Sequence, residues 1–123
     1  MIKYEPAPEI KYKIENIVRK LDFGHVDISR IACFKSRGST SRGTIARCYA
    51  LSKIWQQSLN VPAHYIIEIL SERFDKLSEA DKDRVLIHEI MHIPKSFGGG
   101  FRHHDFVCRR NVEQLYKRLQ SNT

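Results

Sequence analysis

The sequence predicts a single α+β domain, in which a small mixed sheet packs against helices. The chain has 123 residues, the usual size of one domain, and we assign residues 1–123 to it. Some segments carry apolar residues at the spacing of a helix, and others are rich in β-branched and aromatic residues. Because both kinds of segment occur along one short chain, we expect helices packed against a sheet.

The amino-terminal half predicts a helix followed by two strands. Ile10, Ile14 and Ile17 recur at the spacing of one helical face, and Val18 and Leu21 extend the same stripe. The segments that follow are richer in β-forming residues and flank a Ser- and Gly-rich stretch. The expected elements are a helix over residues 8–21 and strands over residues 25–34 and 44–51.

The carboxy-terminal half predicts a short helix, a strand and two further helices. Asn60 is expected to end the short helix in a left-handed conformation. Ser78 is expected to cap the next helix, with Asp81 three residues later, and Pro94 to stop it, because a residue before proline avoids the α region. The expected elements are a helix over 52–59, a strand over 64–70, a helix from 78 to 93 and a helix from about 105 to the end.

The composition is that of an ordinary globular protein with a basic surface. The formal net charge of +7 favours acidic partners, nucleic acid among them, although a solvated basic surface is the simpler expectation. No segment approaches the roughly 20 apolar residues of a membrane span, and no apolar secretory signal begins the chain, so we expect a cytoplasmic protein without a membrane partner. Cys33, Cys48 and Cys108 form no CxxC pair, which favours reduced thiols over disulfides or a cysteine-based zinc site.

One strip of ionisable residues interrupts the apolar part of the helix expected from 78 to 93. On a helical wheel, apolar side chains of residues 85–93 cover most of the circumference, while His88, Glu89 and His92 fall within an arc of about 100°. Buried ionisable groups are costly unless they are paired or bind a metal. The strip forms the pattern HExxH, which is typical of a helical zinc site.

The spacing of these three residues suits a catalytic Zn²⁺ ion. His88 and His92 lie one turn apart, so both rings can reach one ion at the roughly 2.0–2.1 Å of zinc–nitrogen bonds. Glu89 is displaced sideways and is expected to hold a zinc-bound water, whose proton it accepts during attack on a carbonyl. We therefore predict His88 and His92 as metal ligands and Glu89 as the catalytic base.

A third protein ligand is expected, because a catalytic zinc ion usually has three. The glycines at 98–100 would let the chain reverse sharply and return towards the metal with His103 or His104. We predict His104 as the ligand, because the last helix is expected to begin directly after it. His103 and, on the last helix, Glu113 remain alternatives.

The stretch FDKLSEADKDRVLIHEIMHIPKSFGGGFRHHD, residues 74–105, resembles the small metallopeptidases found in archaea and phages, and more distantly the SprT-like zinc peptidases. The segment FKSRGSTSRGTIARCYALSKIW is similar as well, so the resemblance spans most of the chain. It implies a minimal zincin-like fold, with a small mixed sheet packed against the HExxH helix and a carboxy-terminal helix. In SprT-like zincins a histidine followed by a small or acidic residue supplies the third ligand, which is similar to His104 and Asp105 here. The resemblance also implies an edge strand that receives extended substrate, which would be HYIIEIL at 64–70.

The leading expectation is a zinc metallopeptidase, a hydrolase that cleaves peptide bonds in protein or peptide substrates. One alternative is a SprT-like DNA-associated protease that uses the basic surface, and another is a zinc-stabilised interaction domain without activity. Arg102, His103 and Tyr116 are candidates for stabilising the oxyanion. The sequence indicates neither a cleavage preference nor an oligomeric state.

Three further aromatic residues are expected in the core. Trp55, Tyr49 and Tyr65 lie in segments that predict regular structure, and we expect them to be buried there rather than to form a platform for stacked bases.

Overall fold

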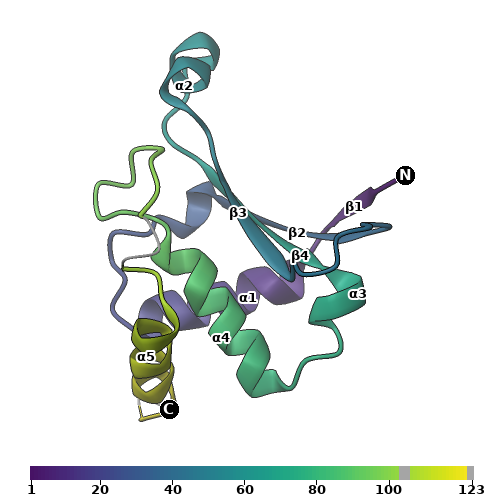
Figure 1. The fold of residues 1–123 in the computed structure, drawn as a ribbon. Helices are drawn as coiled ribbons and strands as arrows, with labels where there is room; N and C mark the ends of the chain where they lie inside the picture. The colour runs from purple at the N-terminus through teal and green to yellow at the C-terminus, as the bar shows by residue number, and fades with distance from the viewer. Residues whose placement is uncertain (103–105, 122–123) are drawn as a thin grey trace.

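The computed structural model describes residues 1–102 and 106–121. It confirms the α+β class, with helices packed against one mixed sheet (Figure 1). In chain order the elements are β1 (Lys3–Pro6), α1 (Pro8–Lys20), a 3-10 turn (Ile28–Arg30), β2 (Ile31–Arg37), β3 (Ala46–Ala50), α2 (Lys53–Leu59), β4 (Tyr65–Leu70), α3 (Ser71–Phe74), α4 (Glu79–Met91) and α5 (Arg109–Ser121).

The strand order of the sheet is β1-β2-β4-β3. β4 pairs in parallel with β2 and antiparallel with β3, so it is an internal strand. The prediction of an edge strand at 64–70 is therefore wrong, and the strand at this edge is β3. An internal strand is covered along its length by neighbouring strands and helices, and β4 accordingly exposes only Ile66.

The core lies between one face of the sheet and the helices. α1 packs against β2, α4 packs against β3, and the two helices contact each other (Figure 1). Ile10, Ile14 and Ile17 of α1 are buried, which confirms the predicted stripe. Each such side chain contributes about 1.5–3 kcal/mol when it is fully removed from water.

Two parts of the sheet differ from the sequence prediction. β2 begins at Ile31 rather than near residue 25, because the Asp27 carboxylate accepts the backbone N–H and the hydroxyl of Ser29 and so favours a 3-10 turn first. β1 is absent from the prediction, and all four of its residues are exposed, so it shows no apolar alternation. Its place in the sheet depends on pairing with β2.

The aromatic residues divide between core and surface. Tyr65 is buried, which confirms its prediction, whereas Trp55 and Tyr49 are exposed and their predicted burial is wrong. Trp55 lies on α2, which extends beyond the body of the sheet (Figure 1). Tyr49 points to the outer face because the preceding residue, Cys48, pairs across from the buried Ile67.

The helix α4 matches its prediction closely. The Ser78 hydroxyl accepts the Asp81 N–H at 3.1 Å, and the helix ends at Met91, three residues before Pro94. Its apolar side chains at 86, 87, 90 and 91 are buried, as the helical wheel predicts. Among the described residues, every helix is too short or too polar to span a bilayer.

Replacing Ser78 by alanine should lower the free energy of unfolding by about 1 kcal/mol, because the Asp81 N–H loses its acceptor at the start of α4. Urea unfolding followed by circular dichroism measures this change. Ser78→Asp keeps an oxygen acceptor at the N-cap and should retain the stability of the parent. Equal stability of the alanine variant and the parent would contradict the assigned cap.

Candidate metal centre

The end of α4 brings two imidazole rings together. Nε2 of His88 and Nε2 of His92 lie 3.3 Å apart, and the planes of the two rings are inclined at 74°. Two nitrogen ligands of a tetrahedral zinc ion, each about 2.0–2.1 Å from the metal, are separated by about 3.3–3.4 Å. The histidine pair therefore has the nitrogen separation that a single zinc ion requires.

The ring of His92 is oriented by the chain that returns after α4. Its Nδ1 lies 2.9 Å from the carbonyl oxygen of Arg102, and the Arg102 N–H donates to the carbonyl of His92 at 2.7 Å. Because a carbonyl can only accept, Nδ1 carries the proton and Nε2 keeps its lone pair. Metal-binding histidines are typically oriented in this way by a second partner.

Tyr65 holds the returning loop in place. Its hydroxyl donates to the carbonyl of Gly100 at 2.8 Å and accepts the N–H of Gly99 at 3.0 Å. The ring of this buried residue packs edge-on against Phe97, at a centroid distance of 5.0 Å. A strand of the sheet thereby fixes the loop only a few residues before Arg102.

The same loop passes too close to α2 for a side chain. Gln56 donates to the carbonyls of Leu51 and Gly98, at 2.7 and 3.2 Å. Gly99 has a φ of 102°, and a Cβ atom there would lie 2.7 Å from the Leu51 oxygen. The sharp reversal expected at 98–100 is therefore present, and it depends on glycine at position 99.

Glu89 lies beside His88 on the wall of a cleft. The cleft has a volume of about 920 Å³ and runs between residues 43–46, α4 and α5. Glu89 is 8% exposed, and burial raises its pKa to about 7. A dication held nearby would favour the charged carboxylate and lower this pKa again.

Two of the three cysteines, Cys33 and Cys48, are poor nucleophiles in this environment. Burial raises the pKa of Cys33 to about 11, and burial together with the charge of Glu89 raises the pKa of Cys48 to about 12. Both remain thiols at neutral pH, and neither they nor Cys108 form a disulfide within the described residues.

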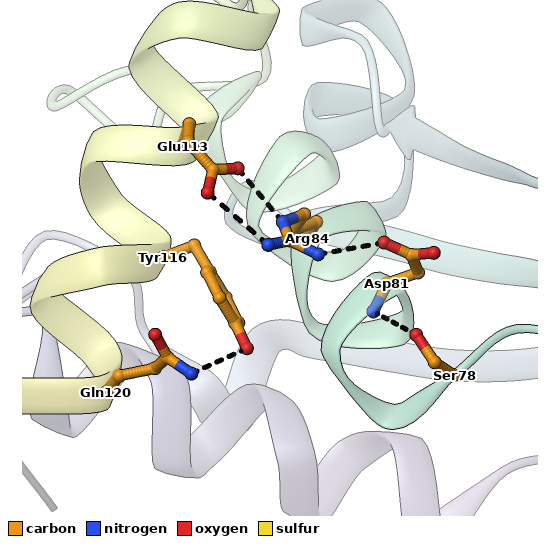
Figure 2. A network of polar contacts seen from close by, with 6 residues as sticks. All are labelled: Ser78, Asp81, Arg84, Glu113, Tyr116 and Gln120. Carbon is orange, nitrogen blue, oxygen red and sulfur yellow. Dashed lines mark hydrogen bonds and ion pairs between the residues drawn. The ribbon is translucent and has the colours of Figure 1, made fainter.

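Glu113, an alternative third ligand, is paired with a guanidinium group in the structure. Figure 2 shows its carboxylate accepting from Nε and Nη2 of Arg84, at 2.9 and 3.3 Å. Nη1 of Arg84 donates to Asp81 at 2.9 Å, and the guanidinium lies 4.1 Å from the centre of the Tyr116 ring. This network joins α4 to α5 along the cleft, and the sequence shows only its Asp81–Arg84 part, at a spacing of three residues.

The other candidate residues are separated by the fold. Tyr116 is buried under Arg84, and its hydroxyl accepts from Gln120. The guanidinium carbon of Arg102 lies 3.4 Å from the centre of the Phe106 ring, and the Arg102 side chain lines a different cavity from that of Glu89. His103 and His104 lie outside the described residues.

The described residues supply two of the expected metal ligands. Within residues 1–102 and 106–121, no group of three or more His, Cys, Asp or Glu side chains is placed to hold a metal ion. His88 and His92 therefore need at least one further ligand to complete a site.

Comparison with known protein families identifies the family of the chain. A model of the family described as "putative phage metallopeptidase" matches residues 2–121, nearly the whole chain. The matched range includes every helix and strand of the fold, with the histidine pair and the walls of the cleft. No curated protein and no solved structure shows significant similarity to the chain.

Replacing Tyr65 by phenylalanine should weaken zinc binding by about 10–100-fold, because the loop that orients His92 loses both of its hydroxyl contacts. Competition with a chromophoric chelator measures the affinity. Tyr12→Phe, which removes the hydroxyl of an exposed residue on α1, is the matched control and should leave the affinity unchanged. Equal affinities for the two variants would show that Tyr65 does not position the site.

Proposed function

Because the chain belongs to the phage metallopeptidase family, we propose that it is a zinc-dependent peptidase whose metal is held by His88 and His92. The observation that carries this proposal is the 3.3 Å separation of the two Nε2 atoms. The contact of His92 Nδ1 with a backbone carbonyl supports it further, since it orients the ring so that Nε2 faces Nε2 of His88, where the metal would lie.

The third ligand in this proposal is His104, although α5 begins at Arg109 and not directly after this residue as the sequence predicts. Arg102, which contacts His92, precedes His104 by only two residues. This return of the chain supports a ligand from the histidines that follow Arg102. His103 is the nearest alternative, and Glu113 would first have to leave Arg84. When bound, zinc acts as a Lewis acid that polarises the substrate carbonyl and lowers the pKa of water.

Glu89 is the proposed general base. It is buried beside His88 and faces the cleft where a peptide would lie. Its carboxylate accepts a proton from the attacking water and passes it to the nitrogen of the departing amine. Burial alone raises the pKa of Glu89 to about 7, and a bound zinc ion would lower it, so the side chain would be a charged carboxylate able to accept the proton at neutral pH.

The substrate in this proposal is an extended peptide that pairs with β3. This strand is at the edge of the sheet, and residues 43–46 at its start line the cleft with His88 and Glu89. An extended peptide can add to such an edge through main-chain hydrogen bonds. β3 therefore takes the role that the sequence assigns to residues 64–70.

The two alternative functions have less support. A closed structural zinc site has four protein ligands, whereas here a cleft of about 920 Å³ opens beside a buried carboxylate, which favours an enzyme. The alternative of a DNA-associated protease is based on the net charge of +7 and stays a prediction. DNA binding that weakens steeply with salt would support it.

The purified protein should contain about one zinc ion per chain, since the proposal has one mononuclear site. His88→Ala and His92→Ala should each abolish tight binding, and His104→Ala should weaken it far more than His103→Ala. Elemental analysis of the dialysed proteins measures the zinc content. Full zinc occupancy in the His88 or His92 variant would refute the assignment, and a stronger effect at His103 would move the third ligand there.

Glu89→Gln should reduce cleavage of an unfolded protein substrate by about 10²–10⁴-fold, because glutamine keeps the side-chain volume but cannot accept the proton. Zinc content should remain that of the parent. Glu72→Gln, at an exposed position of α3, is the control and should cleave at the parent rate. Cleavage by Glu89→Gln at the parent rate would exclude the proposed mechanism.

A further inference from the structure

A second pocket lies on the face of the sheet opposite to α1 and α4. The strand register places Phe34 and Glu68 side by side on this outer face, and Tyr49 beside Ile66. Together with Tyr4 of β1 these residues line a pocket of about 300 Å³. None of them lines the cleft of His88 and Glu89, so the two sites are separate.

The walls of this pocket are aromatic rings from three different strands. Tyr4 and Tyr49 are 58% and 41% exposed, and Phe34 is half-buried between them. The face of an aromatic ring carries a negative electrostatic potential and attracts cations. Rings on an open sheet face could instead stack on nucleic acid bases.

The buried carboxylate of Glu68 decides between these two ligands. Although Glu68 points to the open face, it is only 2% exposed. The Ser36 hydroxyl donates to its Oε2 at 2.5 Å, and the Tyr49 hydroxyl donates to its Oε1. A fixed carboxylate at the base of the rings would repel the phosphates of a nucleic acid and attract a cation.

The charge of Glu68 is only partly compensated in the structure. Its one ion pair with a described residue joins Oε1 to Nη1 of Arg47 at 3.8 Å, and the Arg47 side chain is 38% exposed. The two hydroxyl donors provide hydrogen bonds but no positive charge. Burial of a carboxylate with so distant a cation is costly, and a cation in the pocket would offset that cost.

We propose that this pocket binds a small organic cation of the quaternary ammonium class. Its charge lies against the rings of Tyr4 and Tyr49 and above Glu68, and its methyl groups contact Phe34 and Ile66. The volume is at the lower end of the range for small-molecule sites, which suits a ligand of few atoms. A weakly hydrated cation suits these apolar walls better than a metal ion, which prefers several oxygen ligands.

Titration with choline and with 3,3-dimethylbutan-1-ol, its neutral counterpart of the same shape, tests this proposal. Binding is followed through the backbone amide resonances of the four strands in the full-length protein. Choline should bind at least about tenfold more tightly than the alcohol, because only the cation gains from the rings and the carboxylate. Equal affinity of the two compounds, or no binding of choline, would overturn the proposal.

Two variants locate the site. Glu68→Gln keeps the shape and the acceptor oxygen and should weaken choline binding by about tenfold without changing binding of the alcohol. Phe34→Leu removes one ring but keeps the carboxylate, so it should weaken choline binding even if the Glu68 variant fails to fold. Glu5→Gln removes a carboxylate from the opposite side of β1 and should leave choline binding unchanged. Displacement of choline by a single-stranded oligonucleotide would overturn the assignment in favour of base stacking.

Discussion

The site depends first on the burial of the carboxy-terminal half of α4 around most of its circumference. Leu86, Ile87 and Ile90 are almost completely buried against the sheet and the neighbouring helices. Any rotation of the helix about its axis would expose one of these side chains, at a cost of about 1.5–3 kcal/mol for each. The apolar side chains therefore fix the rotation of the helix about its axis. This rotation directs the polar strip, and with it Glu89, towards the cleft.

The second constraint is the attachment of the loop at 94–102 to the sheet. Tyr65 belongs to the central strand β4, and its hydroxyl bonds both Gly99 and Gly100. The loop in turn presents the carbonyl of Arg102 to His92. A rigid strand thus determines the orientation of an imidazole on a helix, although the two elements are joined only through a loop without regular structure.

Sequence reasoning succeeds where the signal is local. The cap at Ser78, the left-handed Asn60 and the buried faces of α1 and α4 follow from neighbouring residues and are all present. The order of the strands depends on contacts between distant segments. An apolar strand such as β4 has the same sequence pattern at the edge of a sheet as in its interior. For the same reason the exposed β1, the outward-facing Tyr49 and the hydroxyl contacts of Tyr65 could not be predicted. The third ligand stays a prediction.

The free edge of β3 has a consequence for how the protein behaves at high concentration. If β3 receives an extended peptide as proposed, its edge has to stay uncovered, and it would then also offer its main-chain groups to other copies of the chain. β3 has only five residues and carries Arg47 on its outer face. A short strand with a charged side chain limits such self-association, because few hydrogen bonds can form and like charges would meet. In the proposed function, access for substrate and resistance to aggregation would thus be balanced within one short segment.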